Sequence, residues 1–352
     1  MHRTLKPTRA LTLRPRQPKP TGYLWFQKRS STIQAIEPVQ RDVDAVTRDE
    51  FLQHRQDEIP FVLKREEPLD GRIPHTIAKW FEFRSRDKQQ QQQQAYARSY
   101  LSDLGHTPVT YELTLTPSVE RFISSLQSGD LQSSLLSLVA GNATSGSSSP
   151  FLRFTAPLDL FIAALHYNNS QSSPADRLTS LYIAQSSISG LPRVLQEDLA
   201  PPPAIDPGNI YNSSIWLGLT PTYTPLHRDP NPNLFRQLHG AKVVRILPPR
   251  AGETVFRKIQ SSIGGSASSR LRGEEMMYGP EKAALHDAIW AGDGGGSRTI
   301  YEARIGAGDA LYLPEGWWHS LKSAAADMGG GPGGEGELNV SVNWWFRSAG
   351  RK

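Results

Sequence analysis

The chain has 352 residues, of which 38% are hydrophobic, and it contains no cysteine. That length is enough for one large or two small domains. The lack of cysteine excludes disulfides and cysteine-based zinc modules, and no apolar stretch approaches the 18 residues of a membrane-spanning helix.

The net charge of +5 originates at the start of the chain. Residues 1–29 carry eight basic and no acidic side chains, so their +8 leaves −3 for the rest. An acid-free, arginine-rich start is typical of a mitochondrial transit peptide. We therefore expect residues 1–32 to be a basic disordered transit peptide and the protein to lie in the mitochondrial matrix; a plain disordered tail is the alternative. The mildly acidic body gives no strong signal for nucleic-acid binding.

Residues 33–176 are predicted to form an N-terminal α/β extension. Residues 47–56 form a helix in this prediction, because Thr47 and Glu50 have the spacing of a capping box. Further helices are expected at 75–83, 120–127 and 158–166, and strands at 60–66 and 109–114. The glutamine run 89–94 and the Ser/Gly-rich stretch 141–150 are expected to be solvated loops.

Residues 177–352 are predicted to form a catalytic barrel, since alternating apolar residues separated by Pro and Gly indicate short strands. The last strand, 338–346, places Asn339, Ser341, Asn343 and Trp345 on one face. Residues 250–300 are an insertion between barrel strands, which either shapes substrate access or is disordered. Residues 328–336 are expected to be a glycine-rich loop.

Two histidines and a carboxylate in this barrel have the composition of a non-haem Fe(II) site. His227 and Asp229 are two residues apart, so on a strand they point to the same face. His319 completes the set if the strands close into a barrel. Such a facial triad leaves metal positions open for a cosubstrate and O₂.

Three motifs resemble the JmjC-type Fe(II)/2-oxoglutarate oxygenases: TPLHRDPNPNLFRQLHGAKVVRILPP, YEARIGAGDALYLPEGWWHS and NVSVNWWF. The resemblance covers roughly residues 177 to 348 and is closest to the small hydroxylase branch, which includes the asparaginyl hydroxylase of the hypoxia pathway. It implies a mainly β fold with flanking helices, a double-stranded β-helix or jelly-roll cupin barrel. It also implies that iron is held by His227, Asp229 and His319. Simple cupins with HxH, and enzymes with an arginine near residue 329, fit less well.

The same resemblance implies where 2-oxoglutarate binds. Lys242 matches the lysine that pairs with the C5 carboxylate, while Thr224 and Tyr182 match hydroxyl donors to that carboxylate. Asn233 and Asn343 match amides near the metal-bound end. Fe(II) is thus the expected cofactor, with 2-oxoglutarate and O₂ as cosubstrates.

The implied activity is hydroxylation, with succinate and CO₂ as co-products. A protein side chain is the favoured substrate, while an RNA base or a small molecule stays open. The alternatives are an N-methyl-lysine demethylase and a non-catalytic JmjC fold that only binds. We expect a monomer or weak dimer without a membrane partner.

Overall fold

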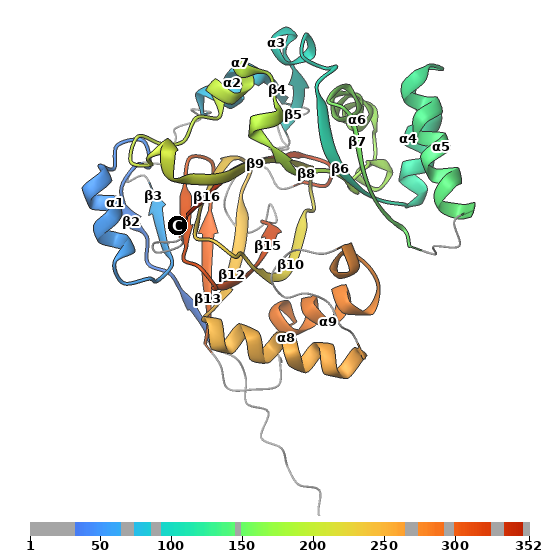
Figure 1. The fold of residues 1–352 in the computed structure, drawn as a ribbon. Helices are drawn as coiled ribbons and strands as arrows, with labels where there is room; N and C mark the ends of the chain where they lie inside the picture. The colour runs from blue at the N-terminus through green and yellow to red at the C-terminus, as the bar shows by residue number, and fades with distance from the viewer. Residues whose placement is uncertain are drawn as a thin grey trace, which may run out of the picture.

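Two β-sheets face one another at the centre of the fold, and helices lie on their outer sides (Figure 1). The computed structural model describes residues 32–64, 74–85, 93–144, 149–264, 274–291, 299–324 and 334–347. Within these residues the protein is mainly β with flanking helices. The predicted double-stranded β-helix is confirmed.

The smaller sheet carries the two histidines of the proposed triad. Its five strands are β1 (Thr32–Ala35), β13 (Thr299–Ile305), β12 (Lys242–Leu247), β15 (Trp318–Ser323) and β10 (Tyr223–Arg228), in that order. β1 runs parallel to β13, and the other neighbours are antiparallel. On its inner face Val244, Ile246 and Leu321 pack against Phe235 and Leu311 of the larger sheet.

The larger sheet has nine strands and supplies the opposite wall. In order they are β2 (Val39–Gln40), β3 (Phe61–Lys64), β14 (Ala310–Leu313), β11 (Asn233–His239), β16 (Leu338–Phe346), β9 (Ile210–Leu219), β8 (Leu181–Ser187), β6 (Pro108–Thr114) and β7 (Phe151–Pro157). Its outer face, with Val340 and Val342 on β16, packs into the largest hydrophobic core of the molecule. The inner face combines apolar side chains on β11 and β14, including Phe235 and Leu311, with polar side chains on β16, as the alternation of β16 predicts.

Helices cover the outer side of each sheet (Figure 1). Those outside the smaller sheet are α8 (Pro249–Ile263) and α9 (Gly279–Trp290), which bury Leu226, Leu247 and Trp318. The others are α1 (Arg48–Arg55), α2 (His75–Trp80), α3 (Ser99–Ser102), α4 (Pro117–Ser125), α5 (Asp130–Thr144), α6 (Asp159–Ser170) and α7 (Arg193–Asp198). A separate hairpin is formed by β4 (Phe81–Ser85) and β5 (Gln93–Ala97).

The first half of the chain contributes strands to both sheets. β1 extends the smaller sheet, whereas β2, β3, β6 and β7 extend the larger one. The capping box at the start of α1 is confirmed: Thr47 Oγ1 accepts from the Glu50 N–H, and the Glu50 carboxylate accepts from the Thr47 N–H.

Three local predictions are wrong at their ends. The Ser/Gly-rich stretch 141–150 does not begin as a loop, because α5 continues to Thr144. The helix expected at 75–83 ends at Trp80, because Phe81 and Phe83 belong to β4, where Phe83 stacks on His239. The glutamine run does not end in a loop: Gln93 and Gln94 begin β5, and Gln94 Nε2 donates to the Asn169 carbonyl.

Some predictions fall outside the described residues. One is the transit peptide, of which only Thr32 is described. Another is the first part of the glutamine run, Gln89 to Gln92. The same holds for residues 65 and 66 of the strand expected at 60–66, for 145–148 of the Ser/Gly-rich stretch, for 265–273 and 292–298 of the insertion, and for 328–333 of the glycine-rich loop. Among the residues that are described, no helix has the length and apolar character needed to cross a membrane.

Candidate metal and cosubstrate site

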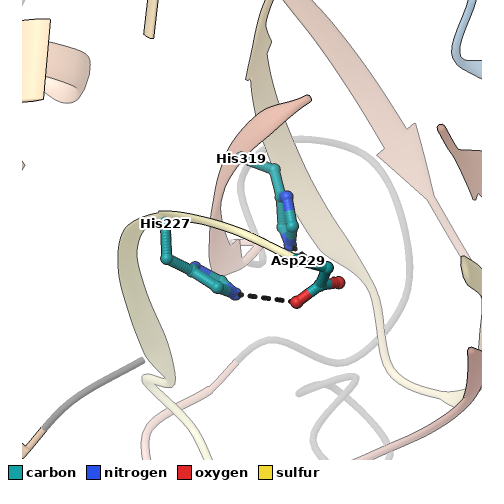
Figure 2. A group of neighbouring side chains, drawn as sticks. All are labelled: His227, Asp229 and His319. Carbon is teal, nitrogen blue, oxygen red and sulfur yellow. Dashed lines mark ion pairs between the residues drawn. The ribbon is translucent and has the colours of Figure 1, made fainter. Parts of the chain in front are cut away.

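His227, Asp229 and His319 meet inside the barrel. His227 lies on β10, Asp229 directly follows that strand, and His319 lies on the neighbouring β15. Figure 2 shows the three side chains converging from these two strands. The Asp229 carboxylate lies 4.0 Å from His227 Nε2 and 3.7 Å from His319 Nε2, and one potential ligand atom from each residue lies within 4.8 Å of the others.

The atoms around the three side chains orient them. His227 Nδ1 lies 2.8 Å from the Pro225 carbonyl, so a proton on Nδ1 leaves Nε2 unprotonated and directed at the other ligands. Asn233, on β11 of the larger sheet, donates from Nδ2 to Asp229 Oδ2. Both histidines are buried, and Asp229 is only slightly more exposed.

A β-bulge sets the direction of His227. Thr224 pairs with Leu321 and His227 pairs with His319, so Pro225 and Leu226 together stand opposite Ser320 alone. In a regular strand, residues three apart point to opposite faces. The extra residue lets Thr224 and His227 both face into the barrel, while Leu226 packs outward against α8 and α9.

Strand register places three inward-facing rows one above another on β15, β12 and β10, together with Thr222 directly before β10. They are His227, His319 and Ile246; Thr224, Leu321 and Val244; and Thr222, Ser323 and Lys242. From the first row to the third is four residues along β15, about 13 Å at the rise of a strand. Lys242 therefore lies at the far end of the same lumen as the triad.

Lys242 is a buried cation. Its side chain is 3% exposed and Nζ donates to Thr222 Oγ1 over 3.0 Å. Burial lowers the pKa of Lys242 to about 7. Within the described part of the chain no ion pair joins it to a carboxylate, so the ammonium lacks the counter-charge that a buried cation requires.

The ring of Tyr182 closes the lysine end of the lumen. It lies on β8, with its centroid 5.9 Å from Lys242 Nζ. The ring fits there because residue 218 is a glycine: a Cβ at that position would lie 2.6 Å from the Tyr182 ring and from the Thr222 methyl.

Asn343 lies on the inner face of the larger sheet. Its Oδ1 accepts a 2.8 Å hydrogen bond from Trp216 Nε1, and both side chains are buried. On the same strand Asn339 and Ser341 are also buried on this face. The inward side of β16 is therefore polar, as the alternation of the last strand predicts.

The comparisons with known proteins now identify the fold family. A family model described as "Cupin-like domain" matches residues 78–352. The chain belongs to the cupin-like domain family.

Curated relatives of this cupin-like chain have names in the JmjC group. Lysine-specific demethylase JMJ31 of Arabidopsis thaliana is 28% identical over 156 residues, 44% of this chain and 24% of that protein. Jumonji C domain-containing protein 5 of Drosophila melanogaster is 26% identical over 170 residues, 47% of this chain and 36% of that protein. Lysine-specific demethylase 8 of Xenopus tropicalis is 21% identical over 169 residues, which are 47% of this chain and 32% of that protein. The chain spans about a third or less of the length of these relatives.

The site of this cupin-like protein fits the cofactor and cosubstrates of the JmjC oxygenases, which are Fe(II), 2-oxoglutarate and O₂. Two imidazoles and a carboxylate are the donor set that suits Fe(II). The uncompensated ammonium of Lys242, about 13 Å along the strand from that set, suits the distal carboxylate of a five-carbon keto acid.

The residues that the resemblance implies fall into two groups, those at the lumen rows and those that contact other side chains of the barrel. Lys242, Thr224 and Tyr182 are at or beside the lumen rows, while Asn233 contacts Asp229 and Asn343 contacts Trp216. The sequence motifs did not predict that Thr222 is the hydrogen-bond partner of Lys242. The even spacing of Thr222 from Thr224 was the available signal. The narrower likeness to the asparaginyl hydroxylase branch stays a prediction.

Proposed function

We propose that this chain is an Fe(II)- and 2-oxoglutarate-dependent oxygenase that hydroxylates a C–H bond, with a protein side chain as its substrate. The observation that carries the proposal is the buried ammonium of Lys242 at the opposite end of the lumen from the His-Asp-His set. A metal site alone would be equally consistent with a simple metal-binding cupin. The lysine adds a receptor for a dicarboxylate.

The energetics support a bound anion at Lys242. Burying an ammonium away from water costs several kcal/mol unless an anion pairs with it. An ammonium without such an anion loses its proton instead. The pKa of about 7 reflects that penalty. A carboxylate beside Nζ would restore the charged form and form a charge-assisted hydrogen bond.

Bound Fe(II), with 2-oxoglutarate and O₂, supplies an oxidant that converts R–H into R–OH while the keto acid becomes succinate and CO₂. The chain's own residues hold the metal, orient the keto acid and keep water away from it. His227, Asp229 and His319 hold the metal on one side, Lys242 and Thr224 orient the keto acid, and the apolar Val244 and Leu321 between them exclude water from its chain.

N-methyl-lysine demethylation is a second candidate, favoured by the names of the relatives. Two of the three described above are called lysine-specific demethylases. The chemistry is shared: hydroxylation of an N-methyl group gives a hemiaminal, whose C–N bond then breaks to release formaldehyde. The two functions differ in what occupies the substrate pocket.

One experiment with two arms tests both. Purified protein is incubated with Fe(II), 2-oxoglutarate and a mitochondrial or whole-cell extract, and modified peptides are read by mass spectrometry. A parallel arm supplies methylated histone peptides and measures formaldehyde. The His227→Ala variant is the control in each arm.

We expect succinate formation and +16 Da peptides that depend on His227, with little formaldehyde. His227-dependent formaldehyde at a rate comparable with the best hydroxylation substrate would replace hydroxylation by demethylation. Absence of His227-dependent succinate from both arms would refute the oxygenase assignment.

A further inference from the structure

The bulge that directs His227 into the barrel is braced from outside by the insertion helix α9. At the bulge Pro225 has no N–H to give to the ladder. The side chain of Ser320, which stands alone opposite the bulge, donates to the Thr224 carbonyl over 2.8 Å and so ties the two histidine-bearing strands together at the bulge. Ser320 is 0% exposed.

The hydroxyl of Ser320 also accepts a hydrogen bond. Trp290, the last residue of α9, donates from Nε1 to Ser320 Oγ over 2.9 Å. Because a serine hydroxyl has a single proton, this contact fixes the direction of the relay, from Trp290 through Ser320 to the Thr224 carbonyl. The chain of contacts ends three residues before His227 and one residue after His319.

Trp290 is itself held firmly. The Arg245 guanidinium and the Lys322 ammonium each lie 4.6 Å from the indole ring, at cation–π distance. Arg245 also donates to the Ile289 carbonyl over 2.6 Å, which anchors the last turn of α9 to the smaller sheet. The end of α9 is therefore fixed relative to β10, β12 and β15.

We infer that Ser320 and Trp290 are positioning residues for the metal site, and that helix α9 controls metal affinity through them. The inference rests on the proposed metal site. Without the relay the bulge loses its brace, and His227 and Thr224 need not face inward together. Partners that orient metal ligands are commonly worth about 10- to 100-fold in metal affinity.

The larger sheet provides a matched control. In the pairing of β8 with β9, Ala184 and Gln185 together stand opposite Trp216, so here too two residues stand opposite one. Ser186 lies directly after these two residues, is also buried, and accepts from the Thr110 N–H over 3.3 Å. Ser186→Ala thus removes a buried serine hydroxyl at a bulge on a sheet that supplies no metal ligand.

The test measures Co(II) affinity by calorimetry on the full chain without cosubstrate, together with thermal unfolding of the metal-free protein. We expect Ser320→Ala to weaken Co(II) binding by about 10- to 100-fold and Trp290→Phe to weaken it in the same direction. Ser186→Ala should leave Co(II) affinity unchanged while lowering thermal stability to a comparable degree. Trp290→Phe keeps an aromatic ring and leaves β15 intact, so it keeps the test open if Ser320→Ala fails to fold.

Wild-type Co(II) affinity in Trp290→Phe, or in a folded Ser320→Ala, would overturn the inference. Equal weakening by Ser186→Ala would overturn it too, because the effect would then be general loosening. Failure of the proposed function looks different: the wild-type chain would not bind Co(II), or His227→Ala would bind it equally well.

Discussion

At the scale of single residues, Lys242 links stability to pH. Burial lowers its folded-state pKa to about 7 from the ordinary 10.5. Between these two values the unfolded chain binds more protons than the folded one, so the free energy of unfolding rises with pH across that window. Below about pH 7 both states are protonated and the full burial penalty remains.

We therefore predict that wild-type protein gains stability relative to Lys242→Met as pH rises from about 7 to about 10. The unfolding free energy of the wild type minus that of the variant should rise by up to about 1.4 kcal/mol per pH unit, because the variant lacks the titrating group. Urea unfolding of both proteins at several pH values measures it. Parallel stability curves would contradict the low pKa of Lys242.

The same lysine should dominate recognition of the keto acid. Lys242→Ala is expected to raise the KM for 2-oxoglutarate by about a hundredfold or more, because a buried carboxylate loses its cation. Thr224→Val removes one neutral hydrogen bond and should cost about 1 kcal/mol, roughly fivefold. Succinate formation at varied 2-oxoglutarate checks both, and equally small effects would place the C5 carboxylate elsewhere.

The absence of a side chain at Gly218 should determine how closely the Tyr182 ring approaches Lys242. In Gly218→Ala the new methyl would push the Tyr182 ring and the Thr222 side chain away from Lys242. The expected result is a higher KM for 2-oxoglutarate with unchanged Co(II) affinity, because the triad lies two rows away. Unchanged kinetics would show that the ring position is not used in binding.

At the scale of elements, α8 is packed so closely on β15 that only glycine fits at the contact. A Cβ on Gly252 would lie 2.1 Å from the Trp318 ring, and Trp318 precedes the ligand His319. We predict that Gly252→Ala lowers the melting temperature and weakens Co(II) binding, since overpacking costs about 1–3 kcal/mol.

The control for that substitution is Gly141→Ala. Gly141 lies in α5, and its added Cβ would meet no atom within 4 Å. Alanine there should stabilise the protein by roughly 0.5–1 kcal/mol, because glycine is the poorer helix former. Differential scanning calorimetry of both variants decides; a stable Gly252→Ala with normal Co(II) affinity would refute the tight contact.

Short-range patterns predicted many of these elements. Three features can be predicted because each depends on residues that are neighbours in the sequence. They are the alternation of β16, the capping box of α1 and the two-residue spacing of His227 and Asp229. The bulge is not readable this way, since it depends on what β15 places opposite Pro225. For the same reason the end of α2 at Trp80 was missed: the pairing of β4 with β5 decides it.

At the scale of the whole molecule, the charge distribution separates the first 29 residues from the rest. We predict that the native protein is imported into mitochondria and lacks this basic segment when mature. The physical reason is the attraction of an acid-free cationic segment along a membrane potential that is negative inside. N-terminal sequencing with cell fractionation checks this, and an intact Met1 in a cytosolic fraction would contradict it.

The parallel pairing of β1 with β13 has a kinetic consequence. Thr32 lies beside Thr299, so the first strand waits for nearly the whole chain before its partner exists. Closing such distant pairs early is entropically costly, and topologies of this kind fold slowly. During that delay the edge of β13 is open to other chains, and an unpaired edge of this kind promotes aggregation. Residues 227 and 319 likewise meet only through a long-range closure, so the metal site cannot form before β10 and β15 pair.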